Sequence, residues 1–326
     1  MHYFTTLFDS FYLSRGLVMY ESLKTQTADF HLYIFAFDNI AYNILKALNL
    51  EKATIISLKE FESLELLKVK DSRTKAEYCW TSTPSTVLYV LEKFSVPECT
   101  YIDADLMFFS DPAILIDEMN QNCKTVLITE HRYSKLPKLF SKKRNGRFCV
   151  QFITFKNETG SLKVLDRWRE QCIDWCFSKY EDGKFGDQKY LDEWPEMYQN
   201  IHILNNPGGG IAPWNICQYI FRKNENSLTA IIRRNKDKFD VVFYHYQYVK
   251  LLENGNVDIG WYFIPSKIRK LFYLPYLEQI SKKEDLLKSS FKYYKTGFTK
   301  FDAKNIKNLL KIGFKRITYY NILKLN

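Results

Sequence analysis

The sequence predicts an α/β protein whose central sheet is mostly parallel, doubly wound and flanked by helices. Short apolar runs alternate with amphipathic stretches through residues 1–130. These stretches are long enough to form the helical crossovers that parallel strands require. The chain of 326 residues is 46% hydrophobic and 17% aromatic, so it can bury a sizeable core, and disorder along its whole length is excluded. In sheets of this kind, ligands bind at the carboxyl ends of the strands.

The alternation can be followed element by element. It begins with a strand at His2–Leu7 and a helix at Tyr12–Lys24, and the run HLYIFAF within Phe30–Phe37 has the β-branched and aromatic content of a second strand. Further strands are expected at Thr54–Ser57, Thr100–Ile102, Thr125–Thr129, Phe148–Phe155 and Val241–Tyr246. Further helices are expected at Ile40–Leu48, Ser82–Lys93, Ile114–Asn120 and Leu162–Tyr180, with a basic loop at Ser134–Arg147 and a turn at Asn205–Gly210.

Positive charge is concentrated at the C-terminal end of the chain. The net charge is +10, and residues 261–326 hold 15 Lys and Arg but only 4 Asp and Glu. We therefore expect a main domain at 1–260 and a basic, aromatic, helical extension at 261–326. The extension has apolar and Lys residues at near-helical spacing: Ile306, Leu310, Phe314 and Ile317, with Lys304, Lys307, Lys311 and Lys315 among them.

A basic helix with an apolar face favours contact with an anionic membrane surface. Two alternatives remain open. The helix can pack its apolar side on the main domain and present a solvated basic face. A basic stripe is also a first sign of nucleic-acid binding, but no motif supports it, and nucleic acid is not an expected partner.

The seven cysteines are scattered without a CxxC pair, which disfavours a zinc ribbon and a dense disulfide framework. The N-terminus shows no pattern of a secretory signal, and no apolar stretch is long enough for a membrane-spanning helix. The sequence thus predicts a cytoplasmic protein with reduced thiols, soluble or peripheral on the inner face of the cytoplasmic membrane.

The sharpest chemical feature is the segment YIDAD at 101–105. Asp103 and Asp105 lie two residues apart after an apolar strand. Where the chain leaves the extended geometry, both carboxylates can converge on one hard cation, Mg²⁺ or Mn²⁺, with room left for phosphate oxygens. Such a cation stabilises a diphosphate leaving group. The alternative is a pair of solvated acids in a turn.

Three other segments carry candidate residues. His245 ends an apolar, aromatic strand and suits Mn²⁺ better than Mg²⁺, and Lys250 follows where it can meet a phosphate. The pair Asp187-Gln188 can contact sugar hydroxyls or a reacting carbon, although helix capping by Asp187 is the simpler reading. The glycines at 208–210 allow a ligand to approach the backbone, although a plain turn explains them equally well.

With these residues in order, the chain resembles a nucleotide-sugar glycosyltransferase with the GT-A fold. It is most similar to glycosyltransferase family 8, which includes bacterial lipopolysaccharide glycosyltransferases and glycogenin. The resemblance covers about residues 1–250. It is carried by the first strand with Phe8-Asp9-Ser10, the polar helix from Trp80 to Lys93, YIDAD, Asp187-Gln188 and the late His245.

The resemblance implies a UDP-sugar donor, a glycan or lipid-linked acceptor of surface-glycan synthesis, Mn²⁺ or Mg²⁺ as cofactor, and retention of configuration at the transferred sugar. It assigns the metal to Asp103, Asp105 and His245, and the sugar chemistry to Asp187 and Gln188. It assigns the nucleotide to Thr6, Phe8, Asp9, Ala104 and Lys250. In retaining members the Gln was proposed as a weak nucleophile, and a front-face mechanism competes with that account.

The chain departs from this family where Cys149-Val150-Gln151 replaces Asn-Ala-Gly in the middle strand, and Gln151 is then expected to project toward the sugar. His131, Arg132, Gly209 and Trp214 complete the expected sugar and acceptor contacts, although core packing is the commoner role of a Trp. The basic loop and the extension would hold a lipid-linked or anionic acceptor.

Two other functions remain open. A nucleotidyltransferase of the same fold class would have a Gly-rich basic loop after the first strand, where this chain reads Phe8-Asp9-Ser10-Phe11-Tyr12. A non-catalytic glycan- or membrane-binding protein derived from a glycosyltransferase is the other alternative, and the presence of both DxD acids and the late His argues against it.

Overall fold

The computed structural model describes residues 1–135, 143–224, 227–295, 297–300, 306–319 and 321–325, with the side chains of residues 306–309, 318 and 319 left out. The middle of the expected basic loop and Lys304 therefore lie outside the described residues, as do the side chains of Ile306 and Lys307.

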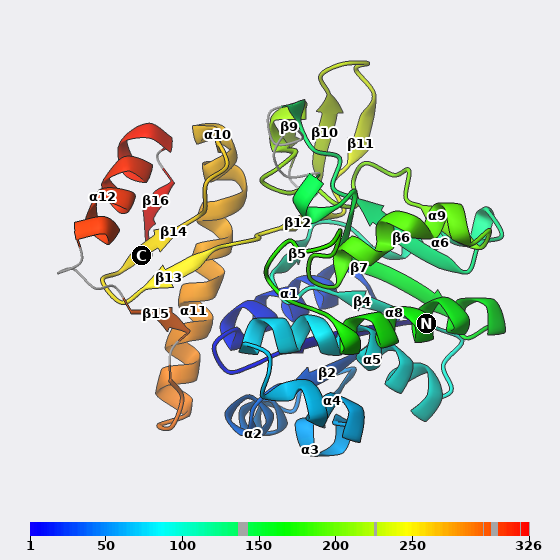
Figure 1. Ribbon diagram of the computed structural model, residues 1–326. Coiled ribbons are helices and arrows are strands. Elements are labelled where there is room, and N and C mark those ends of the chain that lie inside the picture. The colour runs from blue at the N-terminus through cyan, green and yellow to red at the C-terminus, as the bar shows by residue number, and fades with distance from the viewer. Residues whose placement is uncertain (136–142, 225–226, 296, 301–305, 320, 326) are drawn as a thin grey trace.

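A central sheet of seven strands has the order β3-β2-β1-β4-β7-β6-β8 (Figure 1). All its neighbours pair in parallel except β7, which runs antiparallel to both β4 and β6. The predicted α/β fold with a mostly parallel sheet is confirmed. The strands are β1 (His2–Phe8), β2 (Phe30–Ala36), β3 (Ala53–Ser57), β4 (Glu98–Ile102), β6 (Val126–Glu130), β7 (Phe148–Lys156) and β8 (Ile201–Ile203).

Helices cover both faces of this sheet. In β2, Leu32 and Ile34 belong to one buried apolar cluster, whereas Tyr33 and Phe35 belong to another. Both faces are thus buried, which explains why the strand reads as one continuous apolar run. The helices are α1 (Leu13–Gln26), α2 (Asn39–Leu48), α3 (Leu58–Phe61), α4 (Leu64–Lys70), α5 (Lys75–Lys93), α6 (Ala113–Gln121), α8 (Thr159–Asp174) and α9 (Trp194–Met197), with a 3₁₀ turn η1 (Gln188–Glu193).

Two helices differ from their predicted bounds by more than one helical turn. Helix α5 begins at Lys75, well before the expected Ser82, because Thr74 and Glu77 form a capping box at its start. Helix α8 ends at Asp174 instead of Tyr180, since Trp175 is extended and closes the last turn through its backbone N–H. The chain released there leads through a loop to Asp187.

Two small sheets stand beside the carboxyl edge of the central one. Strand β5 (Leu106–Phe108) pairs antiparallel with β12 (Phe243–His245). The expected strand at 241–246 is shorter because the backbone N–H groups of Val241 and Val242 bond instead to Leu228 and Gly208. A three-stranded antiparallel sheet of β9 (Tyr219–Lys223), β10 (Leu228–Ile232) and β11 (Lys238–Asp240) follows the 3₁₀ turn η2 (Ile216–Gln218) and projects at the top of Figure 1.

The C-terminal segment pairs with the rest of the protein through a shared β-sheet. A four-stranded sheet in the order β15-β13-β14-β16 spans the expected boundary at residue 260. Its strands are β13 (Lys250–Leu252), β14 (Asn256–Asp258), β15 (Phe298–Thr299) and β16 (Ile322–Lys324). The helical parts are α10 (Ser266–Ile268), the π-helical turn η3 (Arg269–Tyr273), α11 (Leu274–Ser290), α12 (Ile306–Phe314) and the π-helical turn η4 (Lys315–Tyr319).

Lys315 fastens the last helical turn to this sheet. Its ammonium group is fully buried and lies 2.6 Å and 2.7 Å from the two carboxylate oxygens of Asp258. The rings of Trp261 and Tyr248 flank it, with centroids 4.1 Å and 4.9 Å from Nζ. Removing one partner of such a buried pair typically costs about 3–5 kcal/mol of stability.

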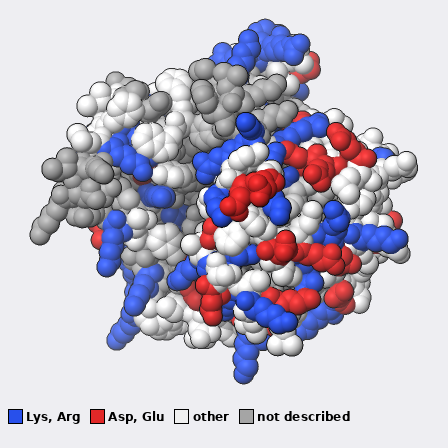
Figure 2. Space-filling view, in the orientation of Figure 1, with Lys and Arg blue, Asp and Glu red and all other residues white. Residues whose placement is uncertain are grey.

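Charge is spread unevenly over the surface. In Figure 2, acidic and basic atoms mix over the helices of the main sheet on the right, whereas basic side chains project along the lower left edge, where α11 lies. Within the described residues, no helix has the length and apolar character needed to cross a bilayer.

Candidate functional site

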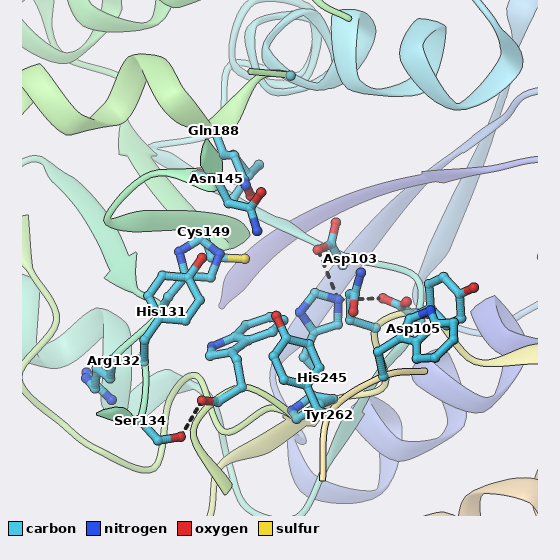
Figure 3. Close-up of a pocket in the computed structure, with 18 of the residues that line it drawn as sticks. Asp103, Asp105, His131, Arg132, Ser134, Asn145, Cys149, Gln188, His245 and Tyr262 are labelled. Carbon is cyan, nitrogen blue, oxygen red and sulfur yellow. Dashed lines mark hydrogen bonds and ion pairs between the residues drawn. The ribbon is translucent and has the colours of Figure 1, made fainter. Parts of the chain in front are cut away.

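A large cleft of about 2720 Å³ opens at the carboxyl edge of the central sheet (Figure 3). Residues that follow β1 and β4 line it, together with residues from the β6–β7 connection, the loop before η1 and the end of β12. This is the place where doubly wound sheets bind their ligands.

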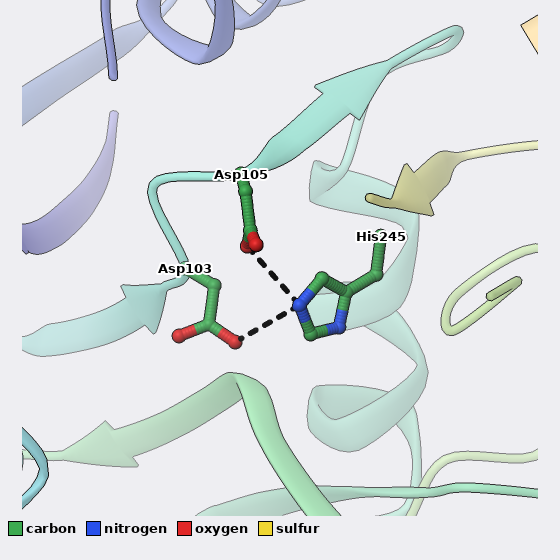
Figure 4. A group of neighbouring side chains, drawn as sticks. All are labelled: Asp103, Asp105 and His245. Carbon is green, nitrogen blue, oxygen red and sulfur yellow. Dashed lines mark ion pairs between the residues drawn. The ribbon is translucent and has the colours of Figure 1, made fainter. Parts of the chain in front are cut away.

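Asp103, Asp105 and His245 meet inside this cleft (Figure 4). Nε2 of His245 lies 3.1 Å from Asp105 Oδ1 and 3.6 Å from Asp103 Oδ2. One ligand atom from each residue lies within 4.8 Å of the others. The sequence predicted this trio, although the two segments are far apart along the chain.

The strand pair β5–β12 brings the trio together. His245 stands opposite Leu106, the residue directly after Asp105. The backbone N–H of Tyr246 also donates to the Asp105 carbonyl, at 3.0 Å. Between the two acids the chain turns, as the hydrogen bond from Leu106 N–H to the Asp103 carbonyl shows. The chain thus leaves the extended geometry between the acids, and both carboxylates point toward the same imidazole.

The electrostatics of the trio reflect a buried cluster. Burial raises the pKa of Asp103 to about 6. The charge of His245 opposes this shift, and the charge of Asp105 adds to it. Burial would also raise the pKa of Asp105, but the charge and hydrogen bond of His245 outweigh it and lower that pKa. Burial disfavours the imidazolium of His245, yet its pKa is raised because Asp105, Cys149 and Asp103 favour the protonated form.

The donor set suits a hard or borderline divalent cation. Two carboxylates and one imidazole are ligands that Mn²⁺ accepts readily, and Mg²⁺ accepts the carboxylates. In the structure the imidazole occupies the space between the carboxylates, where a cation would take the place of its Nε2 proton. The residues therefore fit a metal.

Asp187 and Gln188 face the same cleft from the start of η1. Burial and the nearby Asp103 raise the pKa of Asp187 to about 8. Its backbone carbonyl accepts a hydrogen bond from the Trp168 indole at 2.9 Å, which fixes the loop. The amide of Gln188 donates to the Asn145 carbonyl at 2.8 Å.

Four of the five expected nucleotide contacts line the cleft: Phe8, Asp9, Ala104 and Lys250. Oδ1 of Asp9 accepts the backbone N–H groups of Phe11 and Tyr12, and burial followed by repulsion from Asp38 raises its pKa. Thr6 does not reach the cleft, because it is fully buried within β1.

On the other side of the trio, aromatic residues form a wall. His131 stacks on Tyr133 with ring centroids 4.6 Å apart, and Trp214 packs edge-on against both His131 and His245. Trp214 is only 4% exposed, so it supports the wall more than it offers a face for stacking. Burial lowers the pKa of His131 to about 3, so this imidazole is neutral.

Arg132 also lines the cleft, but its guanidinium is engaged. It donates to the carbonyls of Gly209 and Leu204, at 3.0 Å and 2.7 Å. In this position it braces the turn at 205–210, and the structure shows no free guanidinium fork there for an acceptor.

Gln151 and Gly209 do not lie where direct sugar contact was expected. Both are buried behind the residues that line the cleft. The side chain of Gln151 is bound to His245 at 2.6 Å. A Cβ on Gly209 would come within 2.6–3.0 Å of Leu204 and Leu115, so the glycine makes room for the core and not for a ligand.

Other lining residues were missed in the sequence. Lys75 faces the cleft from the first turn of α5, and its charge acts on Asp9. Tyr133 and Tyr262 complete the aromatic wall. The position of Tyr133 next to His131 was an available signal, whereas nothing local marks Lys75 or Tyr262.

Solved structures show the same fold. The galactosyltransferase LgtC, solved with donor and acceptor sugar analogs, superposes with a TM-score of 0.53 at 10% sequence identity, covering 86% of this chain and 95% of LgtC. The protein therefore has the GT-A fold.

Sequence comparison gives nearer relatives. No protein-family model matches the chain. The uncharacterized protein YfnF of Bacillus subtilis is 29% identical over 252 residues, 75% of this chain and 80% of YfnF. The uncharacterized protein YfnD of the same organism is 31% identical over 302 residues, 91% of this chain and 94% of YfnD. At this identity over nearly the whole of both chains, the protein belongs to the family of YfnD.

Proposed function

We propose that this protein is a metal-dependent glycosyltransferase that moves a sugar from a nucleotide-diphosphate sugar to a glycan or lipid-linked acceptor. The donor that we propose is a UDP-sugar. The observation that carries the proposal is the cluster of Asp103, Asp105 and His245 inside the cleft of a GT-A fold. The resemblance to glycosyltransferase family 8 in the order of these residues supports it.

The donor would lie along the carboxyl ends of β1 and β4. Asp9 turns Oδ1 to the backbone of its own loop, and we propose that its other oxygen accepts a hydrogen bond from the nucleobase. Lys250 also lines the cleft, and we propose that it meets the diphosphate. Mn²⁺ or Mg²⁺ bound by the trio would supply positive charge against the diphosphate as it leaves.

Asp187 and Gln188 are the residues proposed to face the transferred sugar. Asp187 can accept or donate a hydrogen bond, because its raised pKa of about 8 keeps the proton available near neutral pH. Gln188 approaches from the same loop. We propose retention of configuration, either with Gln188 as a weak nucleophile or by a front-face path in which the leaving phosphate takes the acceptor proton.

The test measures UDP release from a panel of UDP-sugars, with and without Mn²⁺. We expect one donor to be hydrolysed slowly, only with the metal. Asp105→Asn should reduce that rate by about 100-fold or more, since a ligand of the cation is lost. Asp117→Asn, on the exposed face of α6, is the matched control and should leave the rate unchanged.

Four results would contradict the proposal. Metal-independent turnover, or full activity of Asp105→Asn, would remove the metal from the function. Binding of a glycan without turnover of any nucleotide sugar would favour the non-catalytic alternative, whereas formation of a nucleotide sugar from a nucleoside triphosphate would identify a nucleotidyltransferase.

We also propose that the enzyme works at an anionic membrane surface, with α12 and η4 as the contact. Leu310 and Ile317 are 67% and 75% exposed, and Phe314 between them is 54% exposed. Lys311 and Arg316 are exposed beside them. Exposed apolar side chains flanked by basic ones are the pattern of an interfacial helix. This location suits a lipid-linked acceptor.

A further inference from the structure

We propose that Gln151 is a positioning residue that fixes the proton of His245 on Nδ1 and so leaves Nε2 free for the metal. The inference rests on the proposed metal site. It gives a role to a residue whose direct contact with the sugar the structure does not show.

Gln151 touches two of the three proposed ligands at once. Its side-chain Oε1 lies 2.6 Å from Nδ1 of His245. Its backbone carbonyl accepts the N–H of Asp103 at 3.1 Å. Gln151 is fully buried in β7, next to the central strand β4. The amide is therefore packed inside the protein, in contact with the ring of His245.

The orientation of the amide decides which imidazole nitrogen can bind a cation. With Oε1 toward Nδ1, Gln151 accepts a hydrogen bond from the Nδ1–H of His245, and the ring Nε2 points at Asp105 and Asp103. If the amide were turned so that its nitrogen faced the ring, Nδ1 of His245 would have to accept a hydrogen bond from it. The proton of the neutral ring would then sit on Nε2 of His245, between the carboxylates, and exclude a metal. Metal-bound histidines are commonly fixed in this way by an acceptor on the other nitrogen.

Gly210 leaves space for this amide. A Cβ on Gly210 would come within 3.1 Å of the Gln151 side-chain nitrogen and within 2.9 Å of Thr129. Gly210 has a φ of +106°, a backbone conformation that favours glycine. The last glycine of the 208–210 cluster thus makes space for Gln151, which explains part of a motif that first suggested ligand approach.

The test compares Mn²⁺ affinity in the absence of any nucleotide, measured by the EPR signal of free Mn²⁺. Gln151→Leu keeps the approximate volume and removes the acceptor, and it should bind about 10- to 100-fold more weakly. Gln151→Glu restores an acceptor for Nδ1–H and should bind within a few-fold of the wild type. Thr154→Val removes a buried hydroxyl from the same strand, where it bonds to Thr100 far from the trio, and should bind like the wild type.

A second readout is the tautomer itself. Long-range ¹H–¹⁵N spectra of the histidine-labelled, Mg²⁺-loaded wild type should show the His245 proton on Nδ1. A proton on Nε2 would overturn the inference, whatever the variants do. Gln151→Leu, where it folds, should show a mixture of tautomers.

The outcomes separate this inference from the proposed function. A wild type that does not bind Mn²⁺ refutes the metal site, and the inference falls with it. A wild type that binds Mn²⁺ while Gln151→Leu binds equally well refutes only the role of Gln151. The same applies if Gln151→Glu fails to restore affinity, or if Thr154→Val loses as much as Gln151→Leu.

Discussion

Asp187 has a pKa that is raised by its surroundings in the cleft. Its carboxyl group is 7% exposed and lies near the acidic Asp103, so burial and like charge raise its pKa from 3.8 to about 8. The folded protein then holds a proton that the unfolded chain has released between about pH 4 and pH 8. The metal-free protein therefore loses stability through this window as the pH rises, and the loss is complete above the folded-state pKa.

Asp187→Asn removes this dependence while keeping the shape of the side chain. In EDTA, the variant should melt several degrees above the wild type at pH 8, and the difference should shrink toward pH 4, since a pKa unit corresponds to about 1.4 kcal/mol. Thermal melts across this range check the prediction. A difference that stays constant with pH would contradict a raised pKa.

The sequence could predict a residue of the site where the residue type and its immediate neighbours in the chain point to a function. Asp103, Asp105 and His245 stand out because they are polar residues at the ends of apolar strands, where side chains can bind a ligand. Gln151 and Gly209 are buried outside the lining of the cleft, and the local sequence carries no sign of how deeply a residue is buried. Contacts across strands, such as Gln151 to His245, leave no trace in the local sequence.

At the scale of elements, the C-terminal helix, formed by α12 and η4, exposes large apolar side chains on its surface. The helical spacing of its apolar and basic residues was visible in the sequence, but the direction of its faces was not. Lys315, one of the regularly spaced lysines, points inward to Asp258, whereas Leu310 and Ile317 point outward. The helix is anchored by a buried ion pair, and the exposed side chains of Leu310 and Ile317 are the ones that we propose to meet a bilayer.

This arrangement predicts membrane binding that depends on apolar contact as well as charge. The double variant Leu310→Ser/Ile317→Ser should reduce binding to phosphatidylglycerol vesicles by about tenfold or more, since each side chain loses the free energy of burial in the bilayer. Vesicle co-sedimentation measures it. Leu64→Ser, at an equally exposed site on α4, is the control and should bind normally. Equal binding of the double variant would leave the exposed helix without a membrane role.

At the scale of the whole molecule, the alternation of strands and helices was enough to predict the sheet and its covered faces. The reversed direction of β7 was not predictable, because a strand's own sequence carries no sign of its partners' direction. The pairing of β5 with β12 joins residues far apart in the chain, and it is this pairing that completes the metal site. The sheet that crosses residue 260 likewise joins segments that composition alone separates.

We propose that Asp103, Asp105 and His245 hold a divalent cation that serves a nucleotide diphosphate. The most direct measurement is the anomalous scattering of a crystal grown with Mn²⁺ and UDP. We expect a single strong manganese peak between the two carboxylates and Nε2 of His245, in contact with the diphosphate. UDP bound in the cleft without manganese at this position would contradict it.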